Sequence, residues 1–411
     1  MNFNPIVLSI PIFFLLIGFE LLVDRFTNRH LYQLPDTLAN LSCGITQQLS
    51  GLFLTFFALG AYQFLYEHFA LFPLPHTDYW YWIALYLLVD LAYYWAHRMS
   101  HEVNLFWGGH VVHHQSEEYN LSVALRQSSL QTIWTFAFSL PIALLGFRTI
   151  DFALISAFNT LYQFWIHTEA IRKLPRWVEL IFNTPSHHRV HHGRNPKYID
   201  KNHAGSLIIW DRMFGTFQEE EEAPVYGVTK PLQSWNTLYA NVAHYVDMRE
   251  DLRRIPDWRD RLRYLFKKPG WLPESLGGHR AVPEVDVKTH QKYRTQAFAI
   301  LNYYVLFQYV ICIVITAYFL FQAGKFSLMG KSIMSVVICY TVVNCGVLFE
   351  RRVWVVIAEW IRIILLPALA IAGTFVLQGP AEVYFIAAAY GLVSVCWFSL
   401  VRKKQHHAGP V

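Results

Sequence analysis

Seven apolar runs constrain this chain more than any other feature, because each is close to the roughly 20 residues with which a helix crosses a bilayer. They lie near residues 5–23, 48–72, 79–96, 297–322, 333–349, 353–376 and 381–401. Of the 411 residues, 54% are hydrophobic and only 15% are charged, which is atypical of a soluble protein of this length. The predicted fold class is therefore all-α, a polytopic helical membrane protein.

Two shorter apolar runs, near residues 130–147 and 150–166, contain residues that a simple span avoids. The first includes Pro141, which cannot donate a backbone hydrogen bond, and the second includes the polar Asn159 and Gln163. These two runs are compatible with a bent or re-entrant hairpin in place of two further spans.

The basic residues are unevenly placed, because 21 of the 34 Lys and Arg residues lie between Ile171 and Thr295. Placing them on the cytoplasmic side satisfies the positive-inside rule and puts residues 97–128, residues 168–296 and the carboxyl terminus inside. We expect a multi-pass protein of the inner membrane in a bacterium, or of the endoplasmic reticulum in a eukaryote. This charge pattern indicates topology and contact with anionic lipid, and does not indicate a nucleic-acid partner.

The chain divides into four predicted regions. Residues 1–78 form amino-terminal spans, and residues 79–220 interleave spans with histidine clusters and carry the chemistry. Residues 221–296 are polar and rich in Pro and Gly, as expected of a cytosolic connector that caps the preceding region. Residues 297–411 form a carboxyl-terminal bundle of four spans.

Three histidine clusters follow the predicted spans of the second region. On a helix, positions three and four apart lie on one face with Cβ atoms roughly 5–6 Å from each other. Each cluster therefore presents neighbouring imidazoles toward one point, as a metal ion requires. The clusters are "HRMSH" with His97 and His101, "HVVHH" with His110, His113 and His114, and "HRVHH" with His188, His191 and His192.

The number of histidines says more about the site than their type. Imidazole suits zinc, copper, iron and nickel, so the ligand type alone does not name the metal. Eight histidines exceed what one centre of four to six ligands uses, and no Cys or paired carboxylate joins them. We predict two metals in one cytosol-facing, histidine-rich pocket; interfacial histidines are the alternative for any single cluster.

Eight further histidines fall into three sets. His167, in "QFWIHTE", ends the run before the third cluster and is predicted as a ninth ligand, or else as an interfacial histidine. His187 points about 100° away from His188 on a helix and is predicted to lie behind the ligands. Six more are expected at the surface: His203, His244, His279, His290, His406 and His407.

Ionisable residues inside apolar runs are expensive and usually have a partner. Asp90 precedes His97 by two helical turns, so it is expected either to accept the free N–H of that ligand or to bond a Tyr or Trp of another helix. Glu359 and Arg362, spaced i to i+3, are expected to pair on one helical face.

The order H-x-x-x-H, H-x-x-H-H, H-x-x-H-H around a two-span hairpin resembles the fatty acid hydroxylase/sterol desaturase superfamily of membrane di-iron oxygenases, over roughly residues 80–220. The tracts "YNLSVALRQS", "FWIHTE" and "YGVTKPLQSWN" look most like the alkylglycerol monooxygenase group, which cleaves ether lipids. The resemblance implies two iron ions held by the eight clustered histidines and His167. It also implies that Glu102 is required for activity, and that tetrahydrobiopterin or another external donor supplies electrons.

The reaction that this resemblance implies uses dioxygen to hydroxylate the carbon beside the ether oxygen of an alkylglycerol, and the product collapses to a fatty aldehyde. The lipid would enter from the bilayer through a tunnel, although ordinary span packing also accounts for the aromatic residues proposed to line it. Arg126 and Gln127 are candidates to meet a headgroup or a pterin, with a snorkelling Arg126 as the alternative. The candidate lining residues are Phe106, Trp107, Leu130, Trp134, Phe164 and Trp165.

Two other functions fit the same residues less well. A sterol, fatty acid or carotenoid hydroxylase or desaturase would take electrons through a cytochrome, and since the chain contains no His-Pro-Gly-Gly segment, that redox partner would be a separate protein. A membrane metal transporter would carry ionisable residues along a path through several spans, whereas the histidines here cluster at one face. The oligomeric state is left open by the sequence.

Overall fold

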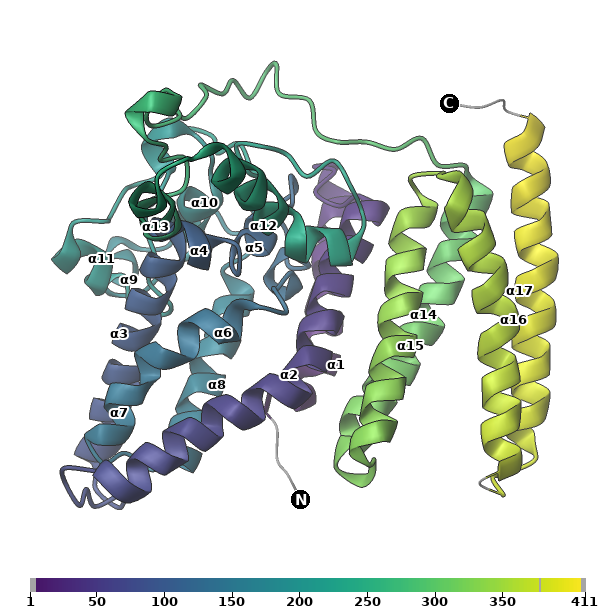
Figure 1. Ribbon diagram of the computed structural model, residues 1–411, viewed down its shortest axis with the longest axis horizontal. Helices are drawn as coiled ribbons and strands as arrows, with labels where there is room; N and C mark the ends of the chain where they lie inside the picture. Colours follow the sequence, from purple (N-terminus) through teal and green to yellow (C-terminus); the bar gives the residue numbers. More distant parts are fainter. Residues whose placement is uncertain (1–4, 377, 408–411) are drawn as a thin grey trace. The chain divides into compact units, whose positions relative to one another are not determined.

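The computed structural model describes the backbone of residues 5–376 and 378–407 and the side chains of residues 8–375 and 378–405. In these ranges the secondary structure is helical, with no strand and one isolated bridge between Gly193 and Tyr226 (Figure 1). The predicted all-α class is confirmed. The side chains of His406 and His407 lie outside the described residues.

The chain forms two compact units, which we call the amino-terminal and carboxyl-terminal units. The first comprises the chain up to Gln233 together with Thr237–Tyr293, and the second comprises Ser234–Asn236 and the residues from Arg294 onward.

The amino-terminal unit contains long apolar helices and a set of helices that lie around the histidines. The long apolar helices are α1 (Pro5–Thr27), α2 (Leu34–Phe69), α3 (Tyr79–Glu102) and α8 (Thr149–Trp165). The helices around the histidines are α4 (Asn104–Trp107), α5 (Val111–His114), α9 (Arg176–Ile181), α10 (Pro185–His192), α11 (Ile209–Phe214), α12 (Thr237–Arg254) and α13 (Trp258–Phe266).

Five described helices are long and apolar enough to cross a membrane, so the protein is a multi-pass membrane protein. One is α2, and the other four make up the carboxyl-terminal unit: α14 (Ala299–Gln322), α15 (Leu328–Leu348), α16 (Val353–Val376) and α17 (Glu382–His407). The apolar runs near 5–23 and 79–96 form the single helices α1 and α3, which are not among these five.

The apolar run near residues 130–147 is bent, as its proline suggests. It is divided into α6 (Gln131–Thr135), the 3₁₀ turn η2 (Phe136–Ser139) and α7 (Leu140–Leu144). The turn to α8 passes through Gly146 at φ +99°, where a Cβ would lie 2.0 Å from the carbonyl oxygen of Phe72, so only glycine fits. The second run, in contrast, forms the continuous helix α8.

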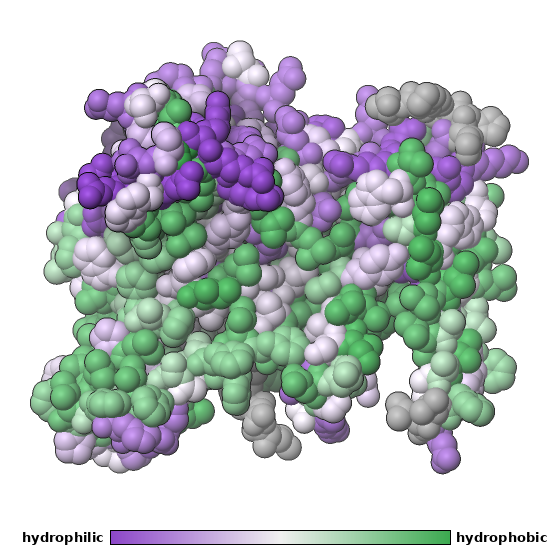
Figure 2. All heavy atoms as spheres, viewed as in Figure 1, coloured by the Kyte–Doolittle hydropathy of each residue, from purple (hydrophilic) through white to green (hydrophobic). Residues whose placement is uncertain are grey.

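Apolar packing joins α2, α3 and the bent segment into one core. Tyr62, Leu85, Val89 and Ile142 are buried in this cluster, and the ring of Tyr62 stacks on Phe152 of α8. On the visible face of this unit, apolar side chains cover the long helices while hydrophilic ones gather over α12 and α13 (Figure 2). The site therefore forms where α3 leaves the apolar layer.

Helices α12 and α13 cover the segment between the first two histidine clusters. Asn104 donates its backbone N–H to the carbonyl of Lys267 (2.9 Å) and its side-chain amide to the carbonyl of Tyr264 (3.1 Å). Behind these bonds, Met248, Ile255 and Tyr264 form a small apolar cluster. The connector is thus packed against the histidine-bearing region.

The carboxyl-terminal unit contains a buried polar network inside four apolar helices. Arg362 donates to both carboxylate oxygens of Glu359, at 2.6 and 2.8 Å, and neither side chain is more than 1% exposed. The same carboxylate accepts from Tyr304 and Asn344, and Arg362 also donates to Tyr390. The predicted pair is confirmed, and it ties all four helices together.

Candidate metal centre

All nine predicted ligand histidines are buried, and short helical turns place them. His97 and His101 occupy the last turns of α3, the second cluster lies on and just before α5, and the third lies on α10. His167 follows the end of α8, as the sequence indicated. None of the nine is more than 7% exposed.

The nine imidazoles form two groups, and within each group one nitrogen from every residue lies within 4.8 Å of the others. The members alternate between groups along α5 and α10, because neighbouring residues of a helix point about 100° apart. The five-histidine group contains His97, His101, His110, His114 and His191, and the four-histidine group contains His113, His167, His188 and His192.

Inside each group the Nε2 atoms of several rings lie within hydrogen-bond distance of one another. No assignment of protons gives each of these nitrogens a hydrogen-bond partner. In the five-histidine group, Nε2 of His110 lies 3.0 Å from Nε2 of His97 and 3.2 Å from Nε2 of His114. In the four-histidine group, Nε2 of His167 lies 2.9 Å from His188 and 3.2 Å from His113. Such clustering fits nitrogen lone pairs converging on a metal ion.

Orphaned nitrogens point to the same conclusion. Within the described part of the chain, the buried Nε2 atoms of His101, His191 and His192 have no hydrogen-bond partner. Leaving a buried polar atom unpaired costs roughly 1–3 kcal/mol, so native proteins rarely leave several together. The donor set therefore fits two adjacent metal ions.

In four of the nine rings, Nδ1, the nitrogen that does not face the group, is hydrogen-bonded to a backbone carbonyl. A carbonyl can only accept, so each Nδ1 must carry the proton, which leaves Nε2 as the lone pair facing its group. The four bonds run from Nδ1 of His97 to His203 (2.7 Å), of His113 to Arg126 (2.9 Å), of His167 to Gln163 (2.7 Å) and of His191 to Lys201 (2.9 Å).

Burial also keeps these rings in the form that binds metals. It lowers the pKa of His113 to about 4, and together with the neighbouring imidazoles it lowers the pKa of His114, His191 and His192 well below the usual value. Metal binding requires neutral imidazole, so the site needs no proton release from these side chains near neutral pH.

Asp90 does not contact His97, so the first of its two expected roles is wrong. Its carboxylate accepts from Asn159, from the backbone and hydroxyl of Ser206, from the backbone of Leu207 and from Nε1 of Trp210. Asp90 therefore fixes residues 205–210, which include the start of α11 and closely follow His203, the residue whose carbonyl orients His97.

His203 was expected at the surface, and that prediction is wrong. Its side chain is fully buried, its ring centroid lies 5.0 Å from that of His101, and neither ring nitrogen has a hydrogen-bond partner among the described residues. The backbone N–H of His203 donates a hydrogen bond to the carboxylate of Asp211 (2.8 Å). No helical spacing marks this histidine, because it reaches the site through a loop.

Four other histidines lie outside the two groups. His279 is exposed as expected, whereas His244 and His290 are partly buried, beside Asn104 and Arg194. His187 is buried next to Thr184 and Phe217.

Glu102 lies at the end of α3 in a charged cluster. Its Oε1 is 3.2 Å from Nε of Arg98 and 3.6 Å from Nζ of Lys268. Lys268 also contacts Asp200 at 3.1 Å, and Asp200 lies 3.9 Å from Nδ1 of His101. The carboxylate is thus next to a predicted ligand without belonging to either histidine group.

Arg126 is buried and structural in its contacts, so it is not a snorkelling side chain. It donates to the carbonyl of Val112 (2.6 Å), to Asn40 (3.1 Å) and to Gln115 (3.0 Å). These bonds brace the second cluster, whose His113 bonds the Arg126 carbonyl.

Comparison with known proteins agrees with this geometry. The fatty acid hydroxylase family model matches residues 82–216. Human alkylglycerol monooxygenase is 39% identical over 332 residues, which cover 80% of this chain and 74% of that protein. The alkylglycerol monooxygenase of Xenopus tropicalis is 36% identical over 356 residues, 86% of this chain and 79% of that protein.

A more distant relative matches a smaller part of the chain. Ornithine lipid hydroxylase OlsE of Rhizobium tropici is 30% identical over 133 residues, 32% of this chain and 40% of that protein. No solved structure gives a significant match. On the long matches above, the chain belongs to the alkylglycerol monooxygenase family, within the fatty acid hydroxylases.

Proposed function

We propose that this protein is a di-iron monooxygenase that hydroxylates the carbon beside the ether oxygen of an alkylglycerol. The observation that carries the proposal is the pair of adjacent, buried, all-histidine groups in a chain 39% identical to human alkylglycerol monooxygenase. We propose the nine grouped histidines as the iron ligands. Imidazole is a suitable ligand for iron, and two groups account for all nine residues.

When bound, the iron pair supplies the activation of dioxygen. One oxygen atom enters the C–H bond, and the other leaves as water after two electrons and two protons have been delivered. The hydroxylated carbon then carries both a hydroxyl and an ether oxygen, so this hemiacetal splits into a fatty aldehyde and glycerol. The chain contributes orientation of the ligands through backbone carbonyls and exclusion of water by burial.

The electron donor and the orientation in the membrane are part of the proposal. We propose a reduced pterin as donor, as the family resemblance implies, with a separate redox protein as the alternative. We place the site on the cytoplasmic face, because 21 of the 34 basic residues lie between Ile171 and Thr295, in the part of the chain that carries the third histidine cluster.

An aerobic assay of the purified full-length protein tests the proposal. We expect about two irons per chain and aldehyde release from an alkylglycerol that depends on the reduced pterin. If the iron-loaded protein does not cleave ether lipids but oxidises a sterol or a fatty acid, the proposed alkylglycerol substrate is wrong. Iron-loaded protein that works only with a reduced cytochrome would show that the donor is wrong.

We propose Glu102 as the catalytic carboxylate. Its contacts with Arg98 and Lys268 hold it beside the five-histidine group, where it can accept a hydrogen bond or a proton from the substrate. We expect Glu102→Gln to keep its iron and lower kcat by roughly 10²–10⁴-fold, the usual contribution of a positioned proton-transfer group. Glu274→Gln, at an exposed position, is the control and is expected to match the wild type. Normal turnover by Glu102→Gln would remove this role.

A further inference from the structure

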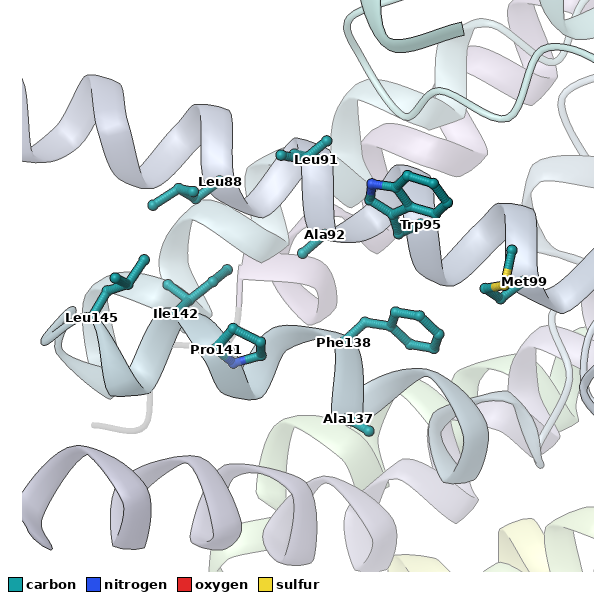
Figure 3. Close-up of a pocket in the computed structure, with 10 residues that line it drawn as sticks. All are labelled: Leu88, Leu91, Ala92, Trp95, Met99, Ala137, Phe138, Pro141, Ile142 and Leu145. Atoms are coloured by element: carbon teal, nitrogen blue, oxygen red, sulfur yellow. The ribbon is translucent and has the colours of Figure 1, made fainter. Parts of the chain in front are cut away.

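An apolar groove of about 510 Å³ runs along the outer side of α3. Side chains of α3 form one wall, and residues 137–145 of the bent segment form the other (Figure 3). Leu88 and Leu145 lie at one end of the groove, and Met99 and Phe138 lie at the other. The lining residues are all apolar, and the volume is within the range of ligand pockets.

The groove has the length of a single lipid tail. Leu88, Ala92, Trp95 and Met99 are spaced three or four apart, so they form one stripe on α3. From the first to the last, this stripe rises roughly 16 Å along the helix axis. Half of a bilayer's hydrocarbon core is about 15 Å thick, so an extended chain from one leaflet matches the stripe.

At the end marked by Met99 and Phe138, the groove meets a carboxylate on the α3 wall, and the wall formed by the bent segment leads toward the histidines. On α3, Glu102 follows Met99 by three positions and extends the stripe with a carboxylate. On the other wall, Trp134 precedes Ala137 by three positions, and it packs so closely on Gly109 that a Cβ there would lie 2.6 Å from its Cδ1. Gly109 immediately precedes His110, a member of the five-histidine group.

The polar end of the groove has balanced charges. The guanidinium of Arg98 lies 5.4 Å from the ring centroid of Trp95, which lines the groove, and it pairs with Glu102. Lys268 bridges Glu102 and Asp200. Two cations and two carboxylates leave no net charge to attract a phosphate, whereas carboxylate and ammonium groups suit the hydroxyls of an uncharged headgroup.

We propose that this groove binds the alkyl chain of the substrate, with the methyl end at Leu88 and Leu145 and the glycerol hydroxyls at Glu102 and Lys268. The groove is thus the subsite that selects chain length, and Trp134 closes its end next to His110. This proposal rests on the proposed function for the identity of the lipid, but the binding of a hydrocarbon chain is testable without turnover.

Photolabelling of the full-length protein in nanodiscs, without oxygen, tests the binding. An alkylglycerol with a diazirine at its methyl end is expected to label the protein around Leu88 and Leu145. A diazirine close to the glycerol is expected to label it around Met99. Labels outside residues 88–102 and 134–145 would overturn the groove, even if the enzyme cleaves alkylglycerols. Labels within them on a protein that cleaves no ether lipid would keep the groove and overturn the proposed function.

Two groove-filling variants test the selection of chain length. Ala92→Phe narrows the groove from the α3 side. Ala137→Phe narrows it from the other side, at an exposed position where the fold tolerates the change. For each we expect KM for hexadecylglycerol to rise on the order of tenfold, as the loss of about two buried methylenes predicts, while KM for octylglycerol stays the same. Ile133→Phe, 42% exposed and outside the groove, is the matched control. An unchanged ratio of the two KM values in both variants would overturn the proposal.

Discussion

Replacing His114 by alanine is expected to remove one iron from the protein and to abolish turnover, and replacing His113 is expected to remove the other. The two residues are adjacent in the chain, yet His114 belongs to the five-histidine group and His113 to the four-histidine group. Even the loss of a residue that hydrogen-bonds to a metal ligand lowers metal affinity or activity roughly 10–100-fold. We therefore expect each ligand variant to lose more than about a hundredfold in kcat.

Iron content and Mössbauer spectra of the two variants provide the measurement, since they identify which iron environment is lost. Each single variant is expected to retain about one iron, and the double variant none. His187→Ala is the control, because His187 is equally buried on α10 but contacts Thr184 and Phe217. Two intact iron sites in either ligand variant would contradict the assignment. So would the same residual spectrum in both.

Local periodicity predicts that the clustered histidines lie close together, but not how they divide between the two groups. The spacings of three and four in "HVVHH" and "HRVHH" predict that each cluster points toward one site. The pairs four apart do share a group, whereas the pairs three apart, His110 with His113 and His188 with His191, belong to different groups. Helical geometry separates His113 from His114, but which group each of them joins depends on where α10 and the end of α8 pack against α5. Those long-range contacts leave no trace in a local spacing.

The fold shows the same division. Apolar length predicted the helices, and Pro141 predicted the bend that separates α6 from α7. The burial of His203 could not be predicted from its polar surroundings, "YIDKNHAGS", because it depends on contacts with distant residues. A polar loop can be buried when an acceptor in the interior forms hydrogen bonds with its backbone N–H groups.

Asp90 supplies that acceptor, and its removal is expected to disturb the five-histidine group from a distance. Its carboxylate is fully buried and accepts five hydrogen bonds, one of them across 120 residues from Trp210. Asp90→Ala leaves the backbone donors of Ser206 and Leu207 unpaired in the interior. We expect this to cost about 3–5 kcal/mol of unfolding free energy.

Iron binding by the folded fraction of Asp90→Ala shows whether Asp90 positions His97 or only stabilises the fold. When residues 205–210 loosen, the His203 carbonyl no longer fixes Nδ1 of His97, so we expect iron affinity at the five-histidine group to fall roughly 10–100-fold. Titration of iron into apoprotein, followed by Mössbauer spectroscopy, resolves the two sites, and the four-histidine group is expected to fill normally. Asp78→Ala, exposed at the start of the same helix, is the control. Equal weakening of both iron sites would mean that Asp90 supports the fold as a whole, because only a specific link through His97 weakens one site and spares the other.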